Sequence, residues 1–120
     1  MAQPVALVPL TSVADVAASI EWYERIGFRL ENTFEEDGVL NWAYLARGGA
    51  HLMLGRATEP VAADRQAVLL YLYADDVAAY HRELGEQGVA VGPLEPRFYM
   101  ERGEFRLADP DGNVLLVGEQ

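Results

Sequence analysis

Cysteine and lysine are both absent from the 120-residue sequence. Without cysteine the chain has no disulfide, no thiolate metal ligand and no thiol nucleophile. Without lysine it cannot form a Schiff base with a carbonyl substrate. Serine is scarce as well, because Ser12 and Ser19 are the only two and neither lies in a Gly-x-Ser-x-Gly motif. These absences exclude thiol, Schiff-base and nucleophile-elbow chemistry.

Positive charge is also in short supply. The chain has nine basic and nineteen acidic residues, which give a formal net charge of −10. We expect no nucleic-acid partner, because phosphate contacts need clustered cations. The acidity favours a neutral or cationic ligand, or it serves only to keep the surface soluble.

Long apolar runs are missing. No stretch approaches the roughly 20 apolar residues that a membrane helix needs, and no signal-peptide pattern opens the chain. We therefore expect no membrane partner and a cytoplasmic location.

The sequence contains an internal repeat. Residues 15–30 align with 76–91, since both begin Asp-Val-Ala-Ala and both carry a later glycine at the same position. Residues 48–55 align with 111–118, with glycine, leucine and glycine at matching positions. The pattern predicts two similar halves related by a pseudo-twofold axis, with a ligand site where they meet. We expect one domain over 1–120, with repeats at about 5–55 and 67–118 and a polar linker at 56–66.

Each repeat is expected to contain a strand, a helix and three further strands. Helical spacing of apolar residues predicts one helix that begins at Asp15 and ends before Gly27, and a second that begins at Asp76 and ends before Gly88. Short apolar or alternating runs predict strands at 5–10, 28–34, 41–46, 51–55, 68–74, 89–91, 104–108 and 114–118. The remaining segment 92–103 is expected to be an irregular loop over the sheet, a plausible lid.

These features resemble a known superfamily. The element order, Trp-Tyr-Glu-Arg-Ile-Gly-Phe at 22–28 and Asp-Pro-Asp-Gly-Asn at 109–113 are similar to the vicinal oxygen chelate group, which includes glyoxalase I, extradiol dioxygenases and the fosfomycin- and bleomycin-resistance proteins. The resemblance implies an α+β fold in which two βαβββ repeats form a curved mixed sheet with the helices outside. It does not imply one activity, because this scaffold serves several.

The resemblance also implies where a divalent metal would be held. The four ligand positions of the superfamily's metalloenzymes, normally His, Glu or Gln, correspond here to Val8, Met53, Leu69 and Leu116. A divalent ion needs oxygen or imidazole donors, which aliphatic and thioether side chains do not supply. We therefore expect no metal, no other cofactor and no chelate chemistry.

Strand alternation predicts the residues that face the expected cleft. They form an aromatic surface with a few polar groups: Trp42, Tyr44, His51, Met53, Tyr71, Tyr73, Glu104 and Arg106, with Phe98 and Tyr99 in the lid. Such a surface is typical of a small-molecule site and suits flat or cationic ligands. The alternative is that the aromatic rings fill the cavity.

Several polar residues have two interpretations. His51 is either a base or ligand contact or a structural histidine, whereas His81 is expected to face solvent. We expect Glu104 and Arg106 to form an ion pair with each other, and the alternative is that they form a substrate clamp. Residues 109–113 are expected to form a turn, because the spacing does not match a calcium-binding loop.

Within the superfamily, residues 8–16 and 103–113 are most similar to the bleomycin-resistance branch. The resemblance implies an acidic, metal-free homodimer that sequesters a cationic glycopeptide without chemistry, with an exchanged N-terminal strand as one arrangement. We expect a metal-independent small-molecule-binding protein, with antibiotic resistance by sequestration as its candidate role and no catalytic residue.

The alternative function is a metal-free isomerase, cyclase or lyase that acts on an aromatic, polyketide-like molecule. In that case acid, base and orienting groups would come from a set of polar residues on the cleft face: Tyr44, His51, Tyr73, Glu104 and Arg106. A regulatory module without catalysis is a third possibility.

Overall fold

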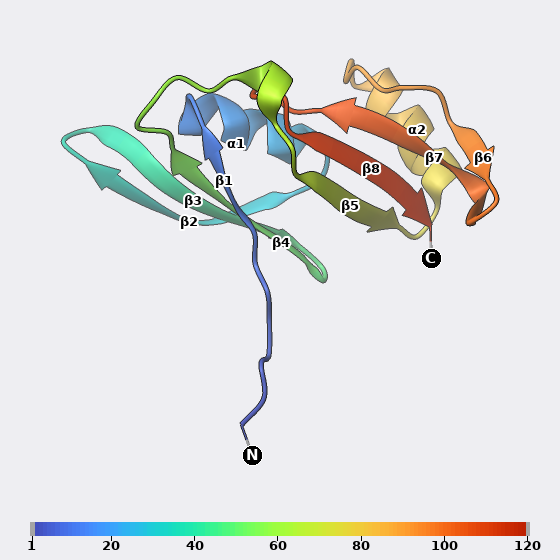
Figure 1. Cartoon of the computed structure of the whole chain (residues 1–120), viewed down its shortest axis with the longest axis horizontal. Helices are drawn as coiled ribbons and strands as arrows, with labels where there is room; N and C mark the ends of the chain where they lie inside the picture. The colour runs from blue at the N-terminus through green and yellow to red at the C-terminus, as the bar shows by residue number, and fades with distance from the viewer. Residues whose placement is uncertain (1, 120) are drawn as a thin grey trace. The chain divides into compact units, whose positions relative to one another are not determined.

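The computed structural model describes residues 2–119 (Figure 1). The chain divides into two compact units, Met1–Val61 and Ala62–Gln120, which we call unit 1 and unit 2. Each unit has its own sheet and its own α-helix, and each is described by itself.

Unit 1 is a four-stranded mixed sheet with one helix. Its elements are β1 (Leu10–Val13), α1 (Val16–Arg25), β2 (Arg29–Glu36), β3 (Val39–Arg47) and β4 (Ala50–Arg56). The strand order is β1-β4-β3-β2, in which β1 runs parallel to β4 and the other pairs are antiparallel.

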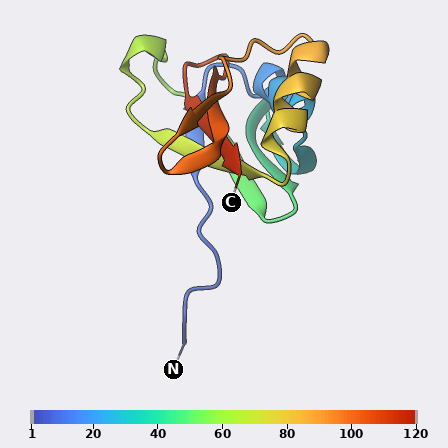
Figure 2. The same ribbon diagram turned by 90° about the vertical axis from the view of Figure 1, so that its right-hand side faces the viewer.

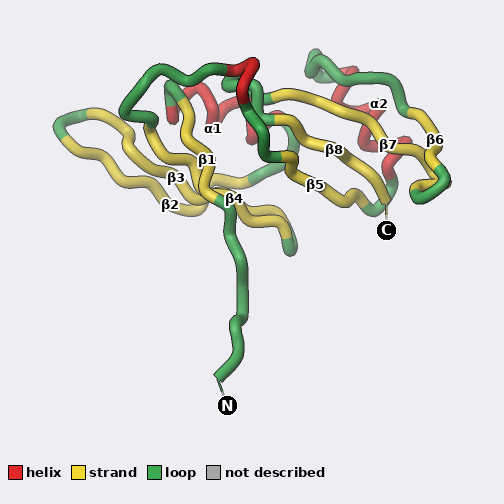
Figure 3. The backbone as a smooth tube through the Cα atoms, viewed as in Figure 1, coloured by secondary structure: helices red, strands yellow, loops and turns green. Residues whose placement is uncertain are grey.

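Unit 2 repeats this arrangement (Figure 3). Its elements are a short 3₁₀ helix η1 (Ala63–Arg65), β5 (Leu69–Ala74), α2 (Val77–Glu86), β6 (Glu95–Arg97), β7 (Met100–Ala108) and β8 (Val114–Glu119). The strand order is β5-β8-β7-β6, in which β5 runs parallel to β8, as β1 does to β4 in unit 1. The predicted α+β fold, with βαβββ occurring twice, is confirmed.

The two helices begin and end in the same way, as the repeat predicts. Asp15 Oδ1 accepts the Ala18 N–H at 3.1 Å, and Asp76 Oδ1 accepts the Ala79 N–H at 3.0 Å. These N-caps satisfy backbone donors that have no partner within the helix. Gly27 has φ +109° and Gly88 has φ +80°, which lets the chain leave each helix in a left-handed conformation.

One face of each sheet is packed against its own helix. In unit 1 the apolar residues between α1 and the sheet are buried: Val16, Ile20, Tyr23, Ala43, Leu45, Leu52 and Leu54. The corresponding set lies between α2 and the sheet of unit 2: Val77, Leu84, Phe105, Leu107, Leu115 and Val117. Figure 2 shows α2 beside the β7 and β8 strands. Within residues 2–119, the α-helix of each unit packs on one face of its sheet, and we call the other face the open face.

Two predicted strands are wrong. The first strand begins at Leu10, not at residue 5, because Pro4 and Pro9 have no N–H to donate and most of residues 2–9 are exposed outside the sheet. The strand predicted at 89–91 does not form. The Val89 N–H instead donates to the Leu84 carbonyl at 3.0 Å and completes the end of α2.

The segment 92–103 is more regular than predicted. It contains β6 and the start of β7, which form a hairpin with Glu95 opposite Glu104 and Arg97 opposite Met100. The register is irregular between these pairs, and Gly103 has φ +100°. No helix among residues 2–119 is long and apolar enough to cross a membrane.

Candidate functional site

The open face of the unit 1 sheet carries the aromatic residues predicted for it. The β3–β4 register pairs Tyr44 with Met53, Trp42 with Gly55 and Ala46 with His51, so these side chains project from the same face. Tyr44 and Trp42 lie with their ring centroids 6.3 Å apart.

A pocket of about 670 Å³ lies on this face. Its lining residues come from β2, β3 and the β3–β4 hairpin: Arg29, Glu31, Tyr44, Ala46, Arg47, Gly48 and His51. The Tyr44 hydroxyl and His51 Nδ1 are 3.0 Å apart, a hydrogen-bonding distance. The pocket therefore offers a phenol, an imidazole, two guanidinium groups and a carboxylate around a small alanine.

Of the predicted site residues, only Tyr44 and His51 line this pocket, whereas Trp42 and Met53 do not. The sequence prediction missed the other five lining residues: Arg29, Glu31, Ala46, Arg47 and Gly48. Arg29 lies opposite Ala46 in the β2–β3 register, so its side chain is on the same face of the sheet as Ala46. Alternation along β2 is sufficient to predict Arg29 and Glu31, whereas Arg47 lies at the end of β3, just beyond the strand predicted at 41–46.

The open face of the unit 2 sheet carries the other predicted residues. Tyr71 and Tyr73 are half-exposed on β5, with ring centroids 6.1 Å apart and ring planes 20° apart. Tyr71 lies opposite Leu116, which lies opposite Arg106, whereas Tyr73 lies opposite Gly118. The arrangement gives this face two stacked phenol rings next to an aliphatic strip.

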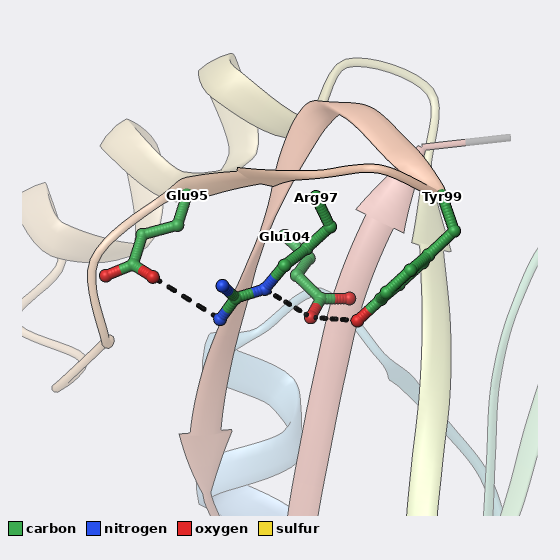
Figure 4. Close-up of polar contacts among 4 residues, drawn as sticks. All are labelled: Glu95, Arg97, Tyr99 and Glu104. Atoms are coloured by element: carbon green, nitrogen blue, oxygen red, sulfur yellow. Dashed lines mark hydrogen bonds and ion pairs between the residues drawn. The ribbon is translucent and has the colours of Figure 1, made fainter.

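Glu104 is held by the β6–β7 hairpin (Figure 4). Its side chain is only 7% exposed. Tyr99 donates its hydroxyl to Glu104 Oε1 at 2.8 Å, and Arg97 donates Nε to the same oxygen at 3.3 Å. The Arg97 guanidinium also pairs with Glu95 at 3.3 Å.

The ion pair expected between Glu104 and Arg106 is therefore wrong. Both residues project from the same face of β7, but the hairpin brings Arg97 to the carboxylate instead. The side chain of Arg106 is exposed and forms no ion pair with any residue from 2 to 119.

Phe98 and Tyr99 form the turn of the same hairpin. Phe98 is 98% exposed, whereas Tyr99 turns toward Glu104. The hydrogen bond to Glu104 raises the pKa of the Tyr99 hydroxyl, because ionising the phenol would break it beside a carboxylate, and Tyr71 is near enough to raise that pKa further. That these residues cover a ligand stays a prediction.

The remaining polar residues have structural partners. His81 was expected to face solvent, but it is half-buried, donates Nε2 to the Gly92 carbonyl at 2.8 Å and packs its ring 4.8 Å from that of Phe105. The predicted turn at 109–113 is confirmed, with the Asp109 carboxylate accepting the N–H groups of Asp111 and Asn113.

A comparison with protein families matches residues 7–117 to the sequence model of the Glyoxalase/Bleomycin resistance protein/Dioxygenase superfamily. The chain belongs to this superfamily. Solved structures of the superfamily's fold match nearly the whole chain. The bleomycin resistance determinant encoded on transposon Tn5 has a TM-score of 0.80 and 21% identity, with 98% of each chain covered.

Two Streptomyces proteins are also similar. The bleomycin-binding protein of bleomycin-producing Streptomyces verticillus, solved with copper(II)-bleomycin, has a TM-score of 0.76 and 23% identity over 100% of this chain and 99% of that one. TnmS3, an antibiotic binding protein from Streptomyces sp. CB03234, has a TM-score of 0.69 and 26% identity over 98% of each chain. No curated protein sequence is significantly similar to this chain.

The metal positions of the superfamily's metalloenzymes do not fit a divalent ion in this member. Met53 pairs with Leu10, and Leu116 pairs with Tyr71, so strand neighbours add no carboxylate or imidazole there. Val8 and Leu69 are aliphatic as well. Within residues 2–119, no group of three or more His, Cys, Asp or Glu side chains could hold a metal.

Proposed function

We propose that this chain is a metal-independent small-molecule-binding protein whose ligand lies on the open sheet face of unit 1. The observation that carries the proposal is the pocket of about 670 Å³ on unit 1, which combines Tyr44, His51 and two arginines. Small-molecule sites are typically hollows with aromatic walls and a few polar groups that fix orientation.

The side chains suggest a division of roles. Trp42 and Tyr44 provide ring surface for stacking, while His51, Arg29 and Arg47 provide hydrogen-bond donors at the pocket. Tyr71 and Tyr73 provide a second ring surface on unit 2. We propose that the ligand of the unit 1 face is an aromatic or partly charged molecule that contacts these rings and donors together.

The antibiotic-binding relatives support sequestration as the biological role. The similar structures include a bleomycin-binding protein and an antibiotic binding protein. The four aliphatic and thioether side chains at the family's metal positions support binding without a metal, since they offer no suitable donor atom.

We also propose a homodimer. Val5 and Leu7 lie in the segment before β1 and are almost fully exposed, which is unusual for apolar side chains. A second copy of the chain could bury them by pairing with or exchanging this segment. Sedimentation of the full chain and of a Val5→Asp/Leu7→Asp variant tests this, because the variant should be monomeric.

Tryptophan fluorescence tests the binding function. We expect chelator-treated protein to give a saturable, stoichiometric change when titrated with metal-free bleomycin or with one member of a panel of aromatic natural products. Trp42→Phe should lose most of this change, whereas Trp22→Phe, in which the altered residue lies on α1, should retain it. A response carried by Trp22 alone, or none with any ligand, would count against the proposal.

A second candidate function is proton-transfer catalysis, and one observation favours it. Tyr44 and His51 are hydrogen bonded at the edge of the pocket, where an acid and a base could both reach a bound molecule. Mass spectrometry of the ligand after incubation distinguishes the two functions. A binding protein returns the ligand unchanged, whereas an enzyme converts it and loses turnover in His51→Ala while still folding.

A further inference from the structure

We propose that unit 2 holds a recognition site for a primary ammonium group, with Glu104 Oε2 as its acceptor and the tyrosines of β5 beside it. The proposal rests on the proposed small-molecule-binding function and adds a recognition site on unit 2 with its own ligand chemistry.

The first observation is that Glu104 is only half satisfied. Its Oε1 accepts two hydrogen bonds, from Tyr99 and Arg97. Its Oε2 is buried and has no hydrogen-bond partner among the described residues. A buried polar atom without a partner costs free energy, and a charged one costs more, so such an atom in a ligand-binding fold indicates a missing donor.

Figure 4 shows the direction in which Oε2 points. Oε2 points away from the Arg97 guanidinium and toward the side on which β8 lies. One position beyond the Phe105–Val117 pair, Glu104 lies next to Gly118, and Gly118 in turn lies opposite Tyr73. The buried Oε2 therefore faces the side of the sheet on which the β5 tyrosines lie.

The position between Glu104 and Tyr73 is filled by a flexible group. Gly118 has no side chain, and a Cβ placed there would be 2.6 Å from Met100 Cε, so the Met100 side chain covers this position. Methionine is unbranched and adapts its shape easily. A ligand group can therefore reach Oε2 by displacing the Met100 side chain without moving the sheet.

The local charges favour a cation. Arg97 is shared between the carboxylates of Glu95 and Glu104, so this cluster retains an excess of negative charge. Arg102 is paired with Glu119. Arg106, on the same face of β7, adds one positive charge, but its side chain is exposed and is therefore screened by solvent. The half-exposed, stacked rings of Tyr71 and Tyr73 add the aromatic surface on which cations bind.

The geometry selects an ammonium over a guanidinium. A guanidinium binds best to both oxygens of a carboxylate at once, through two parallel hydrogen bonds. Oε1 is already occupied by Tyr99 and Arg97, so only one oxygen can accept. A primary ammonium donates from a single point and matches this arrangement.

Three probes of the same shape test the proposal by nuclear magnetic resonance on the full ¹⁵N-labelled chain. The probes are 2-phenylethylammonium, neutral 2-phenylethanol and anionic phenylacetate. We expect the ammonium to shift the amide signals of Gly103 and Gly118 saturably and to bind at least tenfold more tightly than the alcohol, while the acid does not bind. Equal binding of ammonium and alcohol, or no shift at these amides at millimolar ammonium, would overturn the proposal.

Matched variants locate the acceptor. Glu104→Gln should reduce the preference for the ammonium to twofold or less, whereas Glu95→Gln, which removes the exposed carboxylate from the same arginine, should keep it. If both variants keep the preference, Glu104 is not the acceptor. Should Glu104→Gln fail to fold, the comparison of the three probes on the wild-type chain still decides.

The outcomes separate this proposal from the proposed function. If the wild-type chain shows no preference for the ammonium but its Trp42 fluorescence responds to bleomycin or a panel ligand, only the ammonium site is refuted. If the wild-type chain prefers the ammonium but no ligand changes its Trp42 fluorescence, the unit 1 face is refuted as the ligand site.

Discussion

Replacing Asp109 with alanine should destabilise the protein more than replacing any helix-capping aspartate. Asp109 Oδ1 accepts the N–H groups of Asp111 and Asn113, each at 2.9 Å, and Oδ2 accepts the Asn113 side-chain amide at 2.9 Å. All three residues are about 95% buried, since each is only 5% exposed. The carboxylate therefore holds the whole turn between β7 and β8.

The magnitude follows from these contacts. Asp109→Ala leaves two backbone donors and one amide without their acceptor, and each buried donor left unsatisfied costs about 1–3 kcal/mol. Because water can reach a turn after partial opening, we expect a total of about 3–5 kcal/mol rather than the full sum. For a domain of this size that corresponds to a fall in Tm of about 12–20 °C.

Thermal and urea unfolding followed by circular dichroism measure the effect. The matched control is Asp76→Ala, which removes one exposed N-cap hydrogen bond at the start of α2 and should cost about 1 kcal/mol. If Asp109→Ala is no more destabilising than Asp76→Ala, the buried hydrogen-bond network does not hold the turn and the reasoning is wrong.

Three further predictions concern packing and pH. Gly112→Ala should lower the free energy of unfolding, measured by chemical denaturation, by at least about 2 kcal/mol, because Gly112 has φ +82° and an added Cβ would lie 2.5 Å from the Ala63 carbonyl oxygen. The control Gly49→Ala should be nearly neutral, because the space around Gly49 is open. Leu54→Ala should lower the free energy of unfolding by about 2–5 kcal/mol, since Leu54 is fully buried against α1. Val39→Ala, at an exposed position, is the control, and an equal loss of stability in both variants would contradict the assigned core. Burial raises the pKa of Tyr80 from 10.0 to about 12, so this tyrosine ionises more readily in the unfolded chain than in the folded one. The free energy of unfolding should therefore fall as the pH rises from 10 toward 12. Urea midpoints at pH 9, 10 and 11 should fall less steeply for Tyr80→Phe, and an unchanged slope would refute this origin.

Local patterns were sufficient to predict the helices and the two faces of each sheet. Asp15 and Asp76 cap their helices as expected, and alternation correctly separates Tyr44 from the buried Leu45. These features depend on periods of 3.6 and two residues, which are visible within a short stretch of sequence.

Features that depend on pairing between distant residues were not predicted. The three-residue strand β6 exists only because it pairs with β7 across an irregular register at Gly103. The partner of Glu104 is Arg97, which the hairpin brings to the carboxylate, although Arg106 is closer in sequence. Arg29 enters the pocket through its pairing with Ala46. Such contacts come from tertiary geometry, which periodicity does not specify.

The central claim is that the open sheet face of unit 1 binds a small molecule without a metal. The most direct test is a ¹H–¹⁵N titration of the EDTA-treated full chain with metal-free bleomycin and the aromatic panel, with the ligand recovered and weighed by mass spectrometry. The account predicts saturable shifts at the amides of Tyr44, Gly48 and His51 with a ligand of unchanged mass. Shifts that require added divalent metal, or that occur only on α1 and α2, would contradict it.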